Sequence, residues 1–406
     1  MPRPSPSSPH ISLPPGGSPL AGPGPCQKEG RSMPELSTPR AGDLAGSGTA
    51  SIKKIAVLGS SGFVGRAVVA ELDGRGVEVQ PVAAPRVSWP LAQALQAEAV
   101  PADLYEEVVD ELAQQLDGAQ VVINTAGLPD GSAPNSAGLY GANALLPTLV
   151  ARASARVDAK RLVHVSSAAA QGPMALDETA RTMPFSPYSR SKAIGERLLQ
   201  REDCIETVIY RATWVHDVDR PNTRALIRLA QSRMSCVAGD GTAPTPQVLI
   251  DDVVASIVHL GLVSGPVPPI ALQPSNGMTT GLLLRLLGGR EPLHLSPRLA
   301  WYATRCITTY GRTSLQANAH ARRVDMLLFG KRQTPGWLAD QGLAPTLRPE
   351  AWERLRTAGT RLAPTSPPGV DAVTRPRTGD STSRDTSGSP SGRSCRADEA
   401  TRHLTK

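Results

Sequence analysis

Residues 54–65 read KIAVLGSSGFVG, and this stretch decides the fold. The apolar segment 54–58 is followed by Gly59, Gly62 and Gly65, and apolar residues then recur at helical spacing. A strand, a tight glycine turn and a helix start leave backbone N–H groups free to bind a pyrophosphate. The pattern therefore predicts a dinucleotide-binding unit; a glycine-rich turn without a ligand is the alternative.

Each glycine of this turn has an expected role. Gly59 allows the sharp turn, Gly62 lets the backbone approach the phosphates, and Gly65 lets the helix pack on the strand. We expect a positive φ at Gly62, so that a β-branched side chain there would be strained as well as in the way of the phosphates.

Short apolar segments alternate with amphipathic ones through the middle of the chain. This alternation predicts a Rossmann-type, doubly wound α/β fold, in which helices cover both faces of a parallel sheet. Beyond about residue 212 the pattern is less regular, which indicates a smaller C-terminal lobe over a substrate cleft. The predicted strands are 54–58, 78–83, 120–124, 161–166 and 206–211, and the predicted helices are 66–72, 105–116, 142–155 and 188–200.

Composition separates a foldable body from two tails. Residues 1–50 and 361–406 are dominated by Pro, Gly, Ser and other small or polar residues, so we expect both tails to be disordered. The body divides into an expected NAD(P)-binding core over 51–212 and, over 213–360, the remaining sheet elements with a substrate-binding lobe.

Charge and cysteine usage exclude several function classes. The net charge of +7 is spread thinly over 406 residues, without a dense basic run, so we expect no nucleic-acid partner. The five cysteines are widely spaced and form no metal-ligand pattern, which favours a cytoplasmic protein without a metal. The apolar stretches are too short to predict a membrane span.

A second group of residues points to acid–base chemistry. Tyr188 and Lys192 are four residues apart at the start of a predicted helix and therefore share a face. A nearby ammonium favours the phenolate, which makes a tyrosine a usable proton donor or acceptor. Ser167 ends a predicted strand and can bind the reacting oxygen, whereas Ser166 is expected to support the loop. His164, inside the same strand, is expected to be a core histidine.

Taken together, these segments resemble the extended short-chain dehydrogenase/reductases, the NAD(P)-dependent epimerase/dehydratase family. The resemblance covers roughly residues 53–345 and includes GSSGFVG at 59–65, AD at 102–103, NTAG at 124–127, SSA at 166–168 and YSRSK at 188–192. It implies cofactor contacts from the following residues: Gly59, Ser61, Gly62, Phe63, Val64, Gly65, Asp103, Leu104, Asn124, Ala126, Gly127, Asn143, Tyr188 and Lys192.

The resemblance also implies a mechanism. Tyr188 would be the general acid or base, and Lys192 would lower its pKa and hold the nicotinamide ribose. Ser167 would orient the substrate oxygen while a hydride moves to or from the nicotinamide.

Two departures from the family pattern bear on the ligands. The second predicted strand ends without the expected acidic residue, and Arg86 follows it, so NAD or NADP can be the cofactor, with a lean to NADP. Sugar-nucleotide epimerases usually carry an arginine for the diphosphate where this chain has Thr245. The arginines at 220, 224, 228 and 233 are candidate substitutes, or otherwise a solvated helix face.

These observations leave three functions open. The first is an oxidoreductase or epimerase acting on a hydroxyl or ketone of a nucleotide-linked sugar. The second is a hydroxysteroid-dehydrogenase-like reductase, if the apolar stretch 282–310 lines a pocket. The third is a non-catalytic dinucleotide-binding protein, against which the complete Ser/Tyr/Lys set argues. The expected partner is a small-molecule substrate, and a homodimer is possible by resemblance.

Overall fold

A computed structural model describes residues 52–129, 134–311, 321 and 324–361. The expected disordered tails lie outside the described residues, apart from Arg361 at the end of the last helix.

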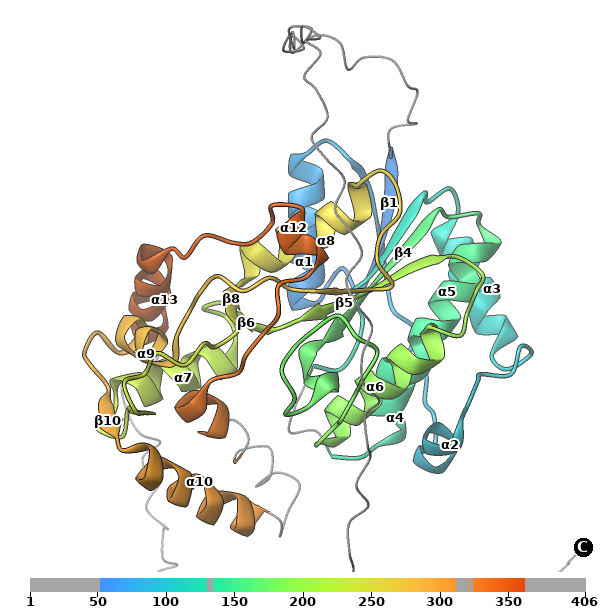
Figure 1. Cartoon of the computed structure of the whole chain (residues 1–406). Coiled ribbons are helices and arrows are strands. Elements are labelled where there is room, and N and C mark those ends of the chain that lie inside the picture. Colours follow the sequence, from blue (N-terminus) through green and yellow to red (C-terminus); the bar gives the residue numbers. More distant parts are fainter. Residues whose placement is uncertain (1–51, 130–133, 312–320, 322–323, 362–406) are drawn as a thin grey trace, which may run out of the picture. The chain divides into compact units, whose positions relative to one another are not determined.

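Six parallel strands form the central sheet, in the order β2-β1-β3-β4-β5-β9 (Figure 1). Five of them match the predicted strands to within about a residue or two at each end, the margin by which strand assignments differ. The sheet strands are β1 (Lys54–Leu58), β2 (Glu78–Val82), β3 (Val121–Asn124), β4 (Arg161–Ser167), β5 (Glu206–Ala212) and β9 (Ile270–Leu272).

Helices cover both faces of the sheet, as the alternation predicts (Figure 1). The side chains of β1 alternate between the two cores, because Ile55 and Val57 pack with one set of helices and Ala56 and Leu58 with the other. One face carries α1 (Phe63–Gly74), α8 (Ile250–Leu262) and α12 (Trp337–Asp340); the other carries α2 (Leu91–Gln96), α3 (Glu106–Leu116), α4 (Ala137–Tyr140), the π-helical turn η1 (Gly141–Leu145), α5 (Leu146–Arg156) and α6 (Pro187–Leu199).

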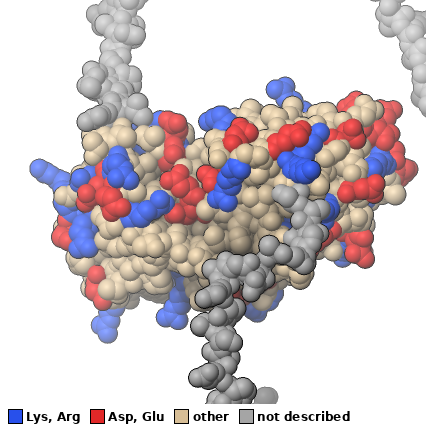
Figure 2. Space-filling view, turned by 90° about the horizontal axis from the view of Figure 1, so that it is seen from above, with Lys and Arg blue, Asp and Glu red and all other residues tan. Residues whose placement is uncertain are grey.

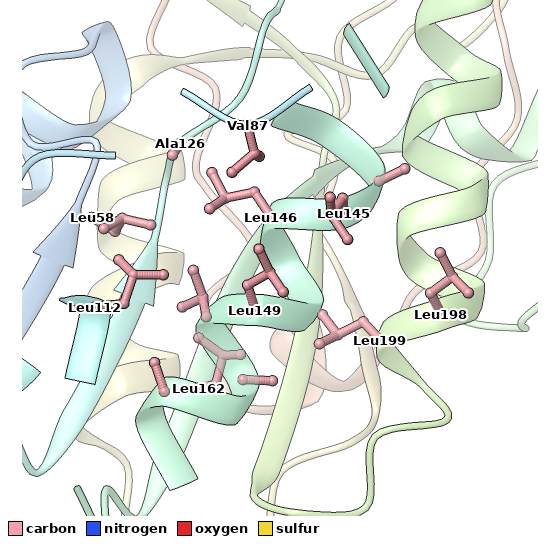
Figure 3. Close-up of a cluster of buried hydrophobic side chains, with 14 of the residues drawn as sticks. Leu58, Val87, Leu112, Ala126, Leu145, Leu146, Leu149, Leu162, Leu198 and Leu199 are labelled. Carbon is pink, nitrogen blue, oxygen red and sulfur yellow. The ribbon is translucent and has the colours of Figure 1, made fainter. Parts of the chain in front are cut away.

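Leucine is the most frequent residue type in the core under α3, α5 and α6 (Figure 3). Leu112 and Leu149 pack there against strand residues such as Leu58 and Leu162, and all four are at most 1% exposed. The adjoining Ala126 follows β3 at its carboxyl end. Close packing of this core therefore fixes the strand ends at which the candidate site lies.

Further elements build a C-terminal lobe around a core of its own. Leu283, Leu284 and Leu287 of α9 lie in that core with Trp352, so this part of the apolar stretch 282–310 packs the lobe rather than lining a pocket. Besides α8, β9 and α12, the elements beyond β5 are β6 (Trp214–His216), α7 (Pro221–Gln231), β7 (Cys236–Ala238), β8 (Gln247–Leu249), α9 (Thr280–Gly288), β10 (Leu293–Leu295), α10 (Pro297–Gly311) and α13 (Pro349–Arg361).

The sheet order places a topological switch point between β1 and β3, and the space outside the carboxyl ends of the strands there is the expected ligand crevice. From β1 the chain extends the sheet to β2, and it then returns to β3 on the other side of β1. Ligands of open α/β sheets bind at such a switch point, outside the carboxyl ends of the strands. In the part of the chain that the structure describes, every helix is too short or too polar to cross a membrane.

Candidate active site

The glycine turn after β1 is held by contacts that only glycines permit. Gly59 has a φ of +77°, and its N–H donates to the Val82 carbonyl at 3.0 Å. A Cβ on Gly59 would lie 2.8 Å from the backbone nitrogen of Ala126, and a Cβ on Gly65 would overlap the Gly59 carbonyl. The turn and the close approach of α1 to it therefore require glycine at both positions.

Gly62 differs from the expectation in one respect. It is the N-cap residue of α1 with a φ of −73°, so the expected positive φ is wrong. The turn needs left-handed backbone only at Gly59, where the chain reverses direction. A Cβ on Gly62 would meet only the Gly59 carbonyl, at 3.1 Å, which leaves open space beside the helix start.

The N-terminus of α1 suits an anion. The helix has no side-chain cap and no acidic residue in its first turn. Its first N–H groups lack intrahelical acceptors, and the helix dipole favours negative charge there. Together with the space at Gly62, this arrangement fits the pyrophosphate of a dinucleotide.

Replacing Gly62 by valine is therefore expected to weaken dinucleotide binding by at least about tenfold, or ~1.4 kcal/mol, because the methyl groups take the space beside those N–H groups. Calorimetric titration with NAD and NADP measures the effect. Gly74→Val at the other end of α1, where a Cβ meets nothing within 4 Å, is the matched control. Unchanged affinity in a folded Gly62→Val protein would contradict the phosphate-binding role.

The segment after β3 continues the site. The Asn124 side chain accepts from the Ala126 N–H at 3.0 Å, and Thr125 Oγ1 donates to the Leu58 carbonyl at 2.8 Å. A Cβ on Gly127 would lie 2.8 Å from Asn143 Oδ1 and 3.2 Å from Lys192 Nζ. Residues expected near the cofactor from β3, η1 and α6 are thus brought together.

Asn143 fastens this segment to α6 from within the π-helical turn η1. Its side chain accepts from the Leu128 N–H at 2.9 Å and donates to the Leu128 carbonyl at 3.1 Å and to Ser191 Oγ at 3.0 Å. Ser191 in turn donates to the Tyr188 carbonyl at 2.8 Å. π-helical turns are frequent at functional sites, and this one places a buried amide beneath the crevice.

Tyr188 stands in the first turn of α6, next to Ser167. Ser186 caps the helix by accepting from the Ser189 N–H at 3.1 Å, and Pro187 occupies the first helical position. Burial raises the pKa of Tyr188, while a hydrogen bond with Ser167 and the positive charge of Arg220 act in the opposite direction. Ser167, at the end of β4, thus lies beside the tyrosine across one loop.

Lys192 lies one turn further along α6. Its Nζ donates to the Val165 carbonyl at 3.1 Å, which aims the ammonium at the carboxyl end of β4. Burial lowers the pKa of Lys192 to about 8, and the carboxylate of Glu196 opposes this effect.

Arg220 brings a cation from the lobe to this site. Its guanidinium lies 4.8 Å from the centre of the Phe63 ring, at the start of α1. In the described ranges it forms no ion pair with a carboxylate. Burial lowers the pKa of Arg220, whereas the charges of Tyr188 and Asp217 raise it. Of the four candidate arginines at 220, 224, 228 and 233, Arg220 is therefore the one whose charge acts on the pKa of Tyr188.

A buried ion pair links α6 to β5. Arg211 of β5 and Glu196 of α6 are 0% and 2% exposed, and their side chains meet at 2.7 Å. Ser166, expected to support the loop, donates instead to the same carboxylate in α6. Neither Arg211 nor Glu196 was predicted, although Tyr188, Lys192 and Glu196 share one helix face by spacing alone.

Other predicted residues lie apart from this cluster. Arg86 is exposed after β2, and Asp103 is exposed in a turn before α3, where Leu104 packs against the core. Thr245 is buried and accepts from the Gln247 side chain at 3.0 Å. Ser61 is exposed, and Val64 packs against the core below α1. His164 is 1% exposed, as expected of a core histidine, but neither of its ring nitrogens has a hydrogen-bond partner among the described residues.

Charges of both signs share the face of the molecule that Figure 2 shows, with acidic and basic side chains interspersed over it. Across the described ranges no group of His, Cys, Asp or Glu residues is arranged to hold a metal ion.

Solved structures with the same fold include two enzymes. The UDP-glucuronic acid 4-epimerase from Bacillus cereus, in complex with NAD, is 17% identical over 77% of this chain and 100% of its own, with a TM-score of 0.51. TunA, an NAD-dependent NDP-hexosamine 5,6-dehydratase of tunicamycin biosynthesis, is 18% identical over 76% of this chain and 98% of its own, with a TM-score of 0.50.

No curated protein matches the sequence. The sequence model of the NAD dependent epimerase/dehydratase family matches residues 55–261, which span the glycine turn, the Ser167 strand, the Tyr188 helix and Arg220. The chain belongs to the NAD dependent epimerase/dehydratase family.

Proposed function

We propose that the protein is an NAD(P)-dependent oxidoreductase or epimerase that acts on a hydroxyl or ketone of a nucleotide-linked sugar. The observation that carries this proposal is the meeting of Ser167, Tyr188 and Lys192 at the carboxyl end of β4, beside Gly127 and the crevice. Ligands of this fold class bind at that edge of the sheet.

The residues of the site divide the chemistry among themselves. The Tyr188 phenolate takes up the proton of the reacting hydroxyl as the carbon loses a hydride, and the resulting phenol returns a proton to the oxygen in the reverse direction. Ser167 holds the reacting oxygen beside the tyrosine, and Lys192, aimed by the Val165 carbonyl, holds the ribose. The nicotinamide ring, when bound, accepts or donates the hydride.

A charged substrate fits this crevice better than an apolar one. Arg220 places a guanidinium beside Tyr188 and Phe63 without an ion-paired carboxylate in the described ranges. A buried cation gains most from an anionic ligand. Of the apolar stretch 282–310 that supported a hydroxysteroid pocket, Leu283, Leu284 and Leu287 lie in the lobe core, whereas Leu299 and Tyr302 are exposed. The position of Arg220 favours a nucleotide-linked sugar. Both neighbours described above carry such substrates in their names.

Turnover tests this function. The protein is incubated with NAD or NADP and a panel of nucleotide-linked sugars, and reduced nicotinamide and sugar epimers are followed by absorbance and by NMR. We expect at least one nucleotide sugar to be converted. Conversion of apolar ketones alone would favour the reductase alternative, and cofactor binding without any turnover would favour the non-catalytic one.

NADP(H) is expected to bind at least as tightly as NAD(H). β2 ends at Val82 without an acidic residue that would repel a 2′-phosphate, and the exposed Arg86 follows it. Arg86→Ala should therefore weaken NADP binding by roughly tenfold, since a hydrogen bond to a charged group contributes about 1.5–3 kcal/mol, and leave NAD binding unchanged.

Calorimetric titration of both dinucleotides measures the difference. Arg75→Ala, at the far end of α1 and paired with Glu71, is the control. A strong preference of the unaltered protein for NAD would remove Arg86 from the site.

A further inference from the structure

Residues 331–334 connect the lobe to the loop after β4. The N–H of Lys331 donates to the Pro244 carbonyl at 2.6 Å, ahead of β8. Leu176, in the loop after β4, donates to the Arg332 carbonyl at 3.0 Å and accepts from the Thr334 N–H at 2.9 Å. Backbone hydrogen bonds on both sides therefore fix the position of Lys331.

The Lys331 ammonium lies at the carboxyl ends of β4 and β5. Its Nζ donates to the Gly172 carbonyl, just beyond β4, and lies 5.6 Å from the centre of the Trp214 ring, just beyond β5. Trp214 packs against a small cluster that includes Ala168, the residue after Ser167. The ammonium thus lies beyond the carboxyl ends of β4 and β5, on the side of the Ser167 strand.

This cation has little to balance it. No carboxylate of the described residues lies within ion-pair distance of Lys331, and burial lowers its pKa to about 8. A partly buried ammonium without an anion is costly, and a carbonyl and an aromatic face offset only part of that cost. An oxyanion in the crevice would complete the pairing.

We propose that Lys331, supported by Trp214, binds the diphosphate of the nucleotide-linked substrate. The inference rests on the proposed function. Thr245, where the resemblance led us to expect a diphosphate-binding arginine, is buried and uncharged, and its neighbour Pro244 accepts from the Lys331 backbone. The backbone of Lys331 therefore lies next to the segment that carries Thr245, although it comes from a distant part of the chain.

The position of Lys331 in the sheet order indicates which of two groups it binds, the pyrophosphate of the cofactor or the diphosphate of the substrate. The pyrophosphate of a dinucleotide belongs at the switch point between β1 and β3, next to Gly62. Lys331 contacts segments that follow β4 and β5, on the other side of β3 in the sheet order. The substrate diphosphate is therefore its expected ligand.

The test compares Lys331→Met with Lys331→Arg in the full-length protein, with the exposed Lys160→Met as control. Calorimetry measures binding of UDP, GDP and ADP, of the matching nucleosides, and of NAD and NADP. We expect Lys331→Met to lower the affinity for the tightest-binding nucleoside diphosphate by about tenfold or more, and to leave the affinities for nucleosides and dinucleotides unchanged. Lys331→Arg should keep most of the affinity.

Each other outcome has a definite meaning. Unchanged diphosphate binding in Lys331→Met overturns the inference while the proposed function stands. Loss of NAD and NADP binding instead assigns the cation to the cofactor and also overturns it. If Lys331→Met lowers the melting temperature and weakens binding of every ligand, nucleosides included, the lysine only stabilises the loop after β4, and the inference is overturned. If the unaltered protein binds no nucleoside diphosphate, the proposed function itself fails.

Discussion

Tyr188→Phe is expected to lower turnover by about 10²–10⁴-fold, the usual contribution of a general acid or base. The substitution removes only the hydroxyl that Ser167 faces and that takes part in proton transfer. Its ring and the helix cap at Ser186 remain, so α6 should still begin at Pro187. Dinucleotide affinity should change little, since Lys192 and the glycine turn are untouched.

Steady-state turnover and calorimetric cofactor binding, measured on the same preparation, separate the two effects. Tyr105→Phe is a suitable control for turnover, because it also removes a hydroxyl. That hydroxyl donates to the Ser88 carbonyl at 2.8 Å and does not contact Ser167 or Lys192. A Tyr188→Phe protein with nearly full activity would show that another group moves the proton. A matching loss of cofactor affinity would show that the hydroxyl acts in binding.

The sheet could be predicted from sequence where its strands are buried on both faces. The segments of β1 and β3 are mostly apolar runs between turns, and their nearly complete burial explains that composition; β4 is as buried, but mixes Leu162, Val163 and Val165 with polar residues. β9 escaped prediction because only Ile270–Leu272 pair, inside a proline-rich segment. The three-residue strands of the lobe are likewise too short to show a period.

The candidate site was predictable only where its residues are neighbours in sequence or follow a motif. Tyr188 and Lys192 share a helix face, and Ser167 ends a strand. Arg220 was one of four candidate arginines and Lys331 was not a candidate, because contacts of such residues with distant segments leave no local pattern. The positive φ expected at Gly62 was wrong because Gly59 alone makes the turn.

The buried pair below the site leads to the largest expected change in stability. Arg211→Met should lower the free energy of unfolding by about 3–5 kcal/mol, because it leaves the Glu196 carboxylate buried without its cation. It also removes the donor to the Thr179 carbonyl, which Arg211 Nη1 contacts at 2.7 Å. Chemical denaturation of the apo protein measures the loss.

The double variant Glu196→Leu/Arg211→Met separates an uncompensated charge from lost packing. Replacing both members of a buried pair by apolar residues is often neutral or stabilising, so the double variant should recover much of the loss. Ser166 then lacks its carboxylate partner, which limits the recovery. If the double variant were as unstable as Arg211→Met, the instability would come from the lost Thr179 contact and packing. A stable Arg211→Met protein would mean that water or protonation satisfies the Glu196 carboxylate. The ion pair would then not be needed to fix the position of α6, the helix that carries Tyr188 and Lys192.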